Sequence, residues 1–309
     1  MARWAGLVLI AALLAVWAWE GPAAPDTPTT QPATRPTTRP ASQPAAVTFS
    51  VATYNINFGN PNLKGIVQTI GKADADVVCV QENTAASRNH LTRHLKRLYP
   101  HMRFRDGRYA EGFAFLSKVP ITDLKFLPRT AGYFGTWLCR VRLGGRQIQI
   151  ANVHLRPTIP PGEAKLKELW KLLVRTERIR LREIAALHKQ LSKTLPVIVA
   201  GDFNAPPMLP SAAFLTERGF TDSFASGNED APRHSTWWWR SGDVVWRFRL
   251  DYIFHSRQMR TQSSQILPSN ASDHYLVVSR LSWVPKPRCA PAATRASASR
   301  PQQYPTAAP

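Results

Sequence analysis

The chain has 309 residues, of which 44% are hydrophobic and 19% are charged, a composition that excludes wholesale disorder and fits a folded globular domain. Its 40 Lys and Arg residues exceed its 20 Asp and Glu residues, for a formal net charge of +20 at pH 7. That sign favours polyanionic partners, such as nucleic acid, anionic lipid headgroups or acidic polymers, although a general solubility bias explains it equally well. The three cysteines, Cys79, Cys139 and Cys289, are too few for a disulfide framework and match no metal motif.

Residues 1–19 have the pattern of an export signal. Arg3 precedes an uncharged apolar run that ends at Trp19, and small residues follow it. The run is shorter than the roughly 20 residues of a spanning helix, which favours a cleaved signal peptide and leaves a signal anchor open. We therefore expect an exported protein, either secreted or periplasmic, or tethered to the membrane and facing outside the cytoplasm.

Two low-complexity arms flank the central part of the chain. Residues 20–47 are dominated by Pro, Thr, Ala and Gln, and residues 285–309 have the same character. Such segments cannot bury enough apolar surface to fold, so we expect a disordered linker and a disordered tail. Between them, residues 48–284 are predicted to form one domain, which we expect to be monomeric.

The first half of this domain begins with an alternating, β-branched run at residues 47–56, typical of a strand. A helical spacing of apolar residues follows from position 63 to position 70. The continuous apolar run DVVCVQ, residues 76–81, predicts a strand buried on both faces. A second helix is expected over residues 87–98, and then strands at 113–116, 121–127, 136–143 and 147–154, with a tight turn at Gly144-Gly145.

The second half opens with a long basic stretch, residues 162–191, that predicts a helix. Its charge alone does not assign it to nucleic acid, because a basic helix face is usually just solvated. Strands are expected at 196–200, 250–255 and 275–281, and a short helix near 211–218. Strands in both halves with helices between them predict an α/β fold: a four-layered α/β sandwich, with two mixed β-sheets packed face to face and helices outside.

Polar side chains follow or open six of the apolar runs. Strand ends in layered α/β folds gather such side chains into one crevice. Carboxylates with Asn and His suit a hard cation such as Mg²⁺, with Mn²⁺ as an alternative, and two histidines can exchange protons near neutrality. Together they predict metal-assisted attack of water on a phosphate ester. The residues are Asn55 and Asn57, Gln81 and Glu82, His154, Asp202 and Asn204, Asp251, and Asp273 and His274.

Seven motifs occur in an order that resembles the motif series of the endonuclease/exonuclease/phosphatase superfamily: VATYNINFG, VCVQEN, EGFAFLS, ANVHLRP, VIVAGDFNAPP, RLDYIFHS and SDHYLVV. The resemblance covers about residues 48–283. This group includes deoxyribonuclease I, exonuclease-III-type abasic-site endonucleases, neutral sphingomyelinases and inositol-polyphosphate 5-phosphatases. The resemblance implies a Mg²⁺-dependent phosphoric ester hydrolase. At the histidine motif the abasic-site endonucleases carry a Tyr-containing segment, so NVHLRP argues against a DNA-repair role.

The resemblance also implies roles for single residues. Glu82 would be the principal Mg²⁺ ligand, Asn55 would position the metal or the phosphate, and Asp273 would lie near the metal. Asp202 and Asn204 would orient the nucleophile and hydrogen-bond the pentacovalent centre.

Four further residues would complete the catalytic set. Asp251 would orient His274, which would activate water or stabilise the phosphate. His154 would be a candidate acid for the leaving oxygen, and Glu111 would be the carboxylate paired with it. Which group acts as the base stays open.

Two residues are expected to contact the substrate. Arg156 could clamp a phosphate through two hydrogen bonds, with a surface role equally open. Trp239 belongs to an aromatic segment that resembles one in repair enzymes and could stack on bases. Packing between loop and core is the stronger interpretation of that segment.

The leading hypothesis is therefore an extracytoplasmic, metal-dependent phosphodiesterase, a nuclease acting on DNA or RNA, because the domain is strongly basic. An alternative keeps the chemistry but takes phospholipid headgroups or lipid-linked phosphates at a membrane as substrate. A third hypothesis, ranked below both, is a non-catalytic binding module.

Overall fold

The computed structural model describes residues 47–158, 166–241 and 243–285. The sequence-predicted signal and nearly all of the predicted linker and tail lie outside these residues. The strands are β1 (Thr48–Asn55), β2 (Val77–Gln81), β3 (His101–Arg105), β4 (Phe113–Ser117), β5 (Ile121–Leu127), β6 (Thr136–Leu143), β7 (Arg146–His154), β8 (Val197–Asp202), β9 (Thr221–Asp222), β10 (Trp237–Ser241), β11 (Val244–Phe248), β12 (Asp251–His255), β13 (Met259–Leu267) and β14 (Leu276–Trp283). The helices are α2 (Leu63–Ala73), α3 (Ala85–Leu95), α4 (Leu166–Gln190), α5 (Pro210–Ala213), α6 (Ser223–Gly227) and the 3₁₀ turns η2 (Thr216–Arg218) and η3 (Ala231–Arg233).

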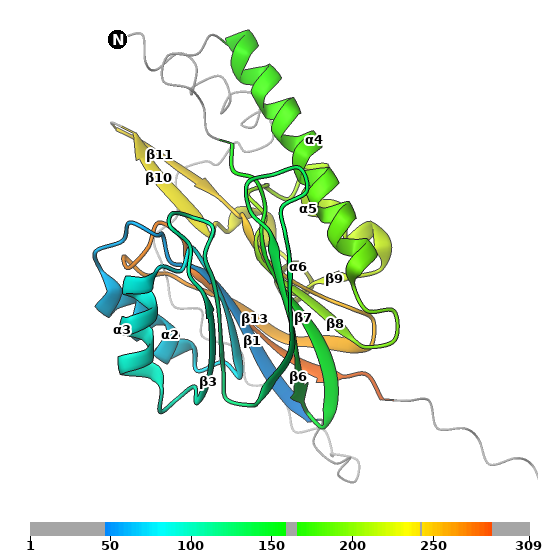
Figure 1. Ribbon diagram of the computed structural model, residues 1–309. Coiled ribbons are helices and arrows are strands. Elements are labelled where there is room, and N and C mark those ends of the chain that lie inside the picture. The colour runs from blue at the N-terminus through cyan, green and yellow to red at the C-terminus, as the bar shows by residue number, and fades with distance from the viewer. Residues whose placement is uncertain (1–46, 159–165, 242, 286–309) are drawn as a thin grey trace, which may run out of the picture.

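Two six-stranded sheets form the centre of the molecule (Figure 1). Their strand orders are β13-β14-β1-β2-β4-β3 and β5-β6-β7-β8-β12-β9, and β10 and β11 form a separate two-stranded hairpin. Each sheet is mixed, because β1 runs parallel to β2 and β7 parallel to β8, whereas β2 and β4 or β8 and β12 are antiparallel. This arrangement confirms the predicted α/β fold class with two mixed sheets.

Strand β2 shows why the sheets need covering on both faces. All five of its residues are buried. Val77 and Cys79 point into an apolar cluster shared with Cys139, Ile150 and other residues of the second sheet. Adjacent side chains of a strand point to opposite faces, so the alternate positions of β2 pack outward against α2 and α3.

The second sheet is covered on its outer face by α4. Ile184 and Leu187 of α4 pack with Val153 of β7 and Val199 of β8. In Figure 1, α2 and α3 therefore lie on one side of the sheets and α4 on the other. The order helices, sheet, sheet, helix is the four-layered sandwich that the sequence predicted. Among the described residues, no helix is both long enough and apolar enough to span a bilayer.

Most predicted elements have the expected type, and the differences have simple causes. The expected helix at 211–218 is interrupted, and forms α5 and η2. The start of the expected helix at 162–191 lies outside the described residues up to residue 165. Strands β3, β9, β10, β11 and β13 were not predicted; in β3 and β13, exposed and polar positions break the apolar pattern. Cys79 and Cys139 are free thiols in the apolar interior, whereas Cys289 lies outside the described residues.

Gly201 near the end of β8 lets the two parallel strands approach closely beside the candidate site. Its φ is +153°, and a Cβ built there would lie 2.0 Å from the carbonyl oxygen of Val153 on β7. We expect Gly201→Ala to lower the free energy of unfolding by at least about 2 kcal/mol, because backbone atoms rather than a flexible side chain must move.

The matched control is Gly71→Ala in α2, where an added Cβ meets no atom within 4 Å. This change should raise the free energy of unfolding by up to about 1 kcal/mol through helix propensity. Urea denaturation of both variants measures the difference. Equal stabilities of the two variants would contradict the close approach at Gly201.

Candidate active site

The strand register aligns three of the predicted residues across the second sheet. His154 at the end of β7 is paired with Asp202 at the end of β8, and Asp202 is paired with Asp251 at the start of β12. Directly paired positions place their side chains on the same face of a sheet. All three residues are buried, with relative exposures of 2% or less. The alignment of these three residues could not be predicted from their positions in the sequence, because it depends on how the strands pair.

Asn55 connects this row to the first sheet. Its buried side-chain amide donates to Glu82 Oε1 at 2.9 Å and to Asp202 Oδ2 at 3.1 Å. Glu82 follows β2, and its second carboxylate oxygen accepts the backbone N–H of Phe58 at 3.0 Å. One amide thus holds carboxylates from both sheets at the same end of the sandwich.

Backbone strain is concentrated at these residues. Five non-glycine residues of the described chain have positive φ, and three of them, Asn57, Glu82 and Asn204, belong to the predicted set. Such conformations are costly and persist where the surrounding structure holds them. For Asn204 the holding contacts are visible: its N–H donates to Asp202 Oδ1 at 2.8 Å and its side chain donates to the Leu155 carbonyl at 3.0 Å.

Asp251 and His274 form the expected carboxylate–imidazole pair. His274 Nδ1 lies 2.9 Å from Asp251 Oδ2, and His274 Nε2 lies 3.7 Å from Asp202 Oδ2. Burial alone would lower the pKa of His274, but the carboxylates of Asp251 and Asp202 outweigh it and raise that pKa to about 10. His274 is therefore a buried imidazolium at neutral pH, with Nδ1–H donating to Asp251.

Asp202 lies between the two histidines, and its environment differs from that of an ordinary carboxylate. Burial raises the pKa of Asp202 to about 6, against the opposing effect of the charge on His274. Burial also raises the pKa of Glu82, and the negative charge of Asp273 adds to that rise. The carboxylates at this end of the sandwich thus outnumber their positive partners, and an added positive charge would be favourable there.

His154 is held in one orientation by two contacts. Its Nδ1 lies 3.1 Å from the Ala110 carbonyl oxygen, and its ring stacks on Phe134 with centroids 4.1 Å apart. A carbonyl only accepts, so Nδ1 carries the proton, and Nε2 faces Asp202 at 3.6 Å and Glu82 at 3.8 Å. Burial lowers the pKa of His154 to about 4, so the ring is neutral at pH 7.

Asp273 is placed by the loop before β14 and by the β10–β11 hairpin. Asn57 donates to its Oδ1 at 3.2 Å, and Trp237 Nε1 donates to its Oδ2 at 3.2 Å. Trp237 also forms a β-bridge with His274. The first tryptophan of the aromatic segment therefore contacts the site directly.

The donor set fits a hard divalent cation at Glu82. Glu82 and Asp273 supply carboxylate oxygens, a ligand type that Mg²⁺ takes. Asn55 would add its amide oxygen, which here accepts the Asn57 N–H at 3.0 Å while the amide nitrogen faces Glu82. Asp202, Asp251 and His274 also offer ligand atoms within 4.8 Å of one another. In that cluster His274 Nδ1 already lies 2.9 Å from Asp251 Oδ2, and His274 Nε2 faces Asp202.

Three predicted residues, Glu111, Trp239 and Arg156, lie apart from this centre. Glu111 is exposed, and its Oε1 accepts the Arg108 N–H at 3.4 Å. Glu111 was expected to pair with His154, but His154 Nδ1 contacts the Ala110 carbonyl instead. Trp239 is 43% exposed on β10 opposite Trp246.

Arg156 leads away from the centre along the molecular surface. Its guanidinium lies 3.8 Å above the ring of Tyr133 and donates to the Tyr133 hydroxyl at 2.7 Å. Tyr133 is 42% exposed, so this stacked pair is available to a bound phosphate.

Two buried residues that position the site, Thr236 and Arg180, were not predicted. The buried Thr236 hydroxyl accepts the N–H of Asp251 at 3.0 Å and fixes the start of β12. The buried Arg180 of α4 donates to the Asn204 carbonyl at 2.7 Å. Gln81, which was among the predicted strand-end residues, donates to Asn152 Oδ1 across the two sheets at 2.7 Å. Thr236 and Arg180 carry no sequence signal, because each acts through backbone groups distant in the chain.

The raised pKa of His274 has a consequence for stability. An imidazole whose pKa is higher in the folded than in the unfolded protein adds stability that is complete below pH ~6.5 and disappears as the pH rises toward 10. In EDTA, the free energy of unfolding should therefore fall between pH 7 and pH 10, and the fall should be smaller in His274→Gln. Asp202 hardly contributes in this range, because its pKa is about 6. Identical pH dependence of the two proteins in urea melts would show that His274 is not charged in the fold.

Solved structures of the same fold include TDP2 from D. rerio in complex with a single-strand DNA product, with a TM-score of 0.59 and 16% identity over 76% of this chain and 98% of that chain. A second is TDP2 from C. elegans, with a TM-score of 0.58 and 14% identity over 77% of this chain and 75% of that chain. An endonuclease/exonuclease/phosphatase family protein from Leptotrichia buccalis has a TM-score of 0.58 and 15% identity, over 76% of this chain and 100% of that chain.

No curated protein matches the chain in sequence. The sequence profile of the Endonuclease/Exonuclease/phosphatase family matches residues 52–274, a span that contains every residue of the cluster from Asn55 to His274. The chain therefore belongs to the endonuclease/exonuclease/phosphatase family.

Proposed function

We propose that this phosphoester hydrolase is an extracytoplasmic, Mg²⁺-dependent phosphodiesterase that cleaves nucleic acid. The observation that supports the chemistry most strongly is the hydrogen bonding of Asn55 to both Glu82 and Asp202. It joins a candidate metal ligand and a candidate water-orienting carboxylate at one point. Export rests on the pattern of residues 1–19 alone.

Each residue has a distinct task in the proposed reaction. A cation held by Glu82, Asn55 and Asp273 would supply Lewis-acid charge next to the phosphate. Asp202 and Asn204 orient the attacking water, and Asp202 takes up its proton, for which a pKa of about 6 is suitable.

The two histidines then differ in function. His274 is an imidazolium at neutral pH, so it stabilises negative charge on the phosphate rather than activating water. His154 presents an unprotonated Nε2, so its predicted role as the acid requires that it first receive a proton. The nearby Asp202 carboxylate favours that protonation, as Asp202 opposes the effect of burial on the His154 pKa.

The charge of the protein supports nucleic acid as the substrate. The formal net charge is +20, and most of the excess basic residues lie within residues 48–284. The structure of D. rerio TDP2 with a single-strand DNA product is consistent with this substrate class on the same fold.

The β10–β11 hairpin favours a second candidate function, hydrolysis of phospholipid headgroups or lipid-linked phosphates. The hairpin extends beyond the two sheets (Figure 1), and its cross-strand pairs Trp237 with Phe248 and Trp239 with Trp246 form one aromatic face. Trp237 contacts Asp273, so a membrane that received Trp239 would lie next to the site.

A substrate panel separates these candidates. The purified protein, with Mg²⁺ or EDTA, is incubated with plasmid DNA, single-stranded DNA, RNA and phospholipid vesicles. Mg²⁺-dependent cleavage of a nucleic acid supports the first function. Hydrolysis confined to vesicles and strongly reduced by Trp239→Ala would establish the second function and overturn the first.

A further inference from the structure

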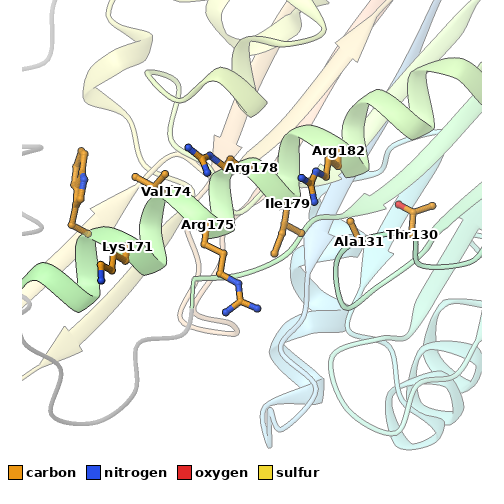
Figure 2. A pocket seen from close by; sticks show the side chains of 9 residues that line it. Thr130, Ala131, Lys171, Val174, Arg175, Arg178, Ile179 and Arg182 are labelled. Carbon is orange, nitrogen blue, oxygen red and sulfur yellow. The ribbon is translucent and has the colours of Figure 1, made fainter.

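A basic hollow lies along α4, outside the cluster of catalytic candidates. It has a volume of about 660 Å³ and lies between the helix and residues Thr130 and Ala131 of the segment that joins β5 to β6. Figure 2 shows Lys171, Arg175, Arg178 and Arg182 projecting from successive turns of α4. Their spacing of four, three and four residues places them on one face of the helix.

The four cations of this face have no acidic partner in the described part of the chain. All four side chains are exposed. Two acidic residues of α4 are used elsewhere: Glu177 accepts from the Ser211 backbone N–H at 2.7 Å, and Glu183 accepts from the Arg156 backbone N–H at 3.0 Å. Exposed basic helix faces are often interspersed with acidic residues that form ion pairs. Glu168 precedes this row by one turn, and among the described residues from Lys171 to Arg182 the face itself carries only cations around a concave surface.

An aromatic side chain completes the hollow. Trp170 lines it and is 54% exposed. The helix from Lys167 to Arg175 has no described buried residue, and burial begins at Thr176. A large exposed indole on a helical segment without a described buried residue is available for stacking on a ligand.

The hollow leads toward the catalytic candidates. Thr130 lines it and also lines a second hollow of about 330 Å³, which His154 borders. The same segment carries Tyr133, which stacks under Arg156, and Phe134, which stacks on His154. The segment between β5 and β6 therefore borders the basic hollow at Thr130 and contacts His154 through Phe134.

We infer that this face of α4 binds the backbone of single-stranded nucleic acid and holds it for cleavage; the inference rests on the proposed function and specifies its substrate. The row from Lys171 to Arg182 extends about 16 Å along the helix axis. That length requires several phosphates in succession rather than one headgroup. Cations that track a backbone, combined with an aromatic platform, are the arrangement that single strands need.

The test compares two triple variants of the full chain that lose the same charge. Arg175→Gln/Arg178→Gln/Arg182→Gln removes three cations of the α4 face, and Arg93→Gln/Lys96→Gln/Arg97→Gln removes three exposed cations in and just after α3, across the sandwich. Binding of a fluorescein-labelled 20-nucleotide single strand is measured by anisotropy in EDTA at several salt concentrations. Hydrolysis of bis-p-nitrophenyl phosphate with Mg²⁺ is measured in parallel.

The α4 variant should bind at least about tenfold more weakly at low salt. The slope of log affinity against log salt should decrease in magnitude by about 2, because each lost single-strand phosphate contact contributes about 0.7. The α3 variant should keep the wild-type slope, and both variants should hydrolyse the small diester at the wild-type rate. Circular dichroism of each variant tests whether the fold is kept. Trp170→Ala, which leaves the charge unchanged, should weaken binding of the single strand by about tenfold.

An unchanged slope in the α4 variant, or an equal decrease in the α3 variant, would overturn the inference. Absence of single-strand binding by the wild type would also overturn it. So would an α4 variant that binds anionic phosphatidylserine vesicles more weakly than the wild type but binds the oligonucleotide equally well. Failure of the wild type to hydrolyse any phosphodiester would instead refute the proposed function, while the salt slopes would still report on α4.

Discussion

Replacing Glu82 with glutamine is expected to reduce Mg²⁺-dependent phosphodiester hydrolysis by at least about a thousandfold. Glutamine preserves the size of the side chain and can still accept the Asn55 amide, so the change removes mainly the negative charge that would hold the cation. Metal charge at a phosphate contributes several kcal/mol to transition-state stabilisation, and each 1.36 kcal/mol is a factor of ten. Initial rates at saturating Mg²⁺ measure the effect.

The matched control is Glu111→Gln. Glu111 was predicted as a catalytic residue, but it is exposed, and its carboxylate contacts the Arg108 N–H rather than His154. We expect Glu111→Gln to leave the rate within about threefold of wild type, the usual scatter of a surface change. The free energy of unfolding of Glu82→Gln in EDTA should not decrease, because burial raises the pKa of Glu82 and makes its charge unfavourable in the metal-free fold. Equal activity of Glu82→Gln and Glu111→Gln would contradict the assignment of Glu82.

The second large effect is expected for His274→Gln, which should lower kcat by about a hundredfold or more. The buried imidazolium supplies a positive charge at a site rich in carboxylates, and a neutral amide cannot replace that charge. Removing one preorganised donor to a developing anion typically costs this much. Asp251→Asn should have a smaller effect in the same direction, because it lowers the pKa of His274 without removing the ring.

His255→Gln provides the control for a buried histidine. His255 ends β12, the strand that Asp251 begins, and its Nε2 lies 2.9 Å from the Thr261 hydroxyl. The change disturbs a comparable interior position without touching the candidate site. It should reduce stability but leave kcat near wild type. A similar loss of kcat in both variants would mean that the effect of His274→Gln arises from packing rather than from charge.

The sandwich could be predicted from the sequence because its central strands are distinct apolar runs of strand length. β2 and β8 are continuous apolar runs, as expected for strands covered on both faces. Alternate side chains of each strand pack into the apolar cluster between the sheets and into the cluster under the outer helices. Strands at sheet edges, such as β13 with its polar residues between Met259 and Leu267, lack that pattern and were missed.

For the site, residues directly at strand ends could be predicted, because each follows or opens an apolar run. Asn55, Glu82, Asp202 and Asp251 do so, and hydrogen bonds and strand pairing bring them together. Residues that act through long-range backbone contacts could not be predicted. The hydroxyl of Thr236 holds the N–H of Asp251, a contact that depends on how the β10–β11 hairpin folds back.

Trp239 illustrates the same limit. The sequence identified the aromatic segment, but only the strand register shows that Trp237 faces Asp273 while Trp239 is exposed to solvent. The two side chains lie on the same face of β10, so their position along the hairpin separates them rather than the face that they occupy.

The central claim is that this chain hydrolyses phosphodiesters with a cation held at Glu82, and one measurement tests it most directly. Hydrolysis of bis-p-nitrophenyl phosphate is followed for wild type and Glu82→Gln after EDTA treatment and stepwise return of Mg²⁺. We predict that wild-type activity disappears with EDTA and returns with Mg²⁺, and that Glu82→Gln recovers almost none. Turnover that survives EDTA, or an identical Mg²⁺ response in the two proteins, would contradict the claim.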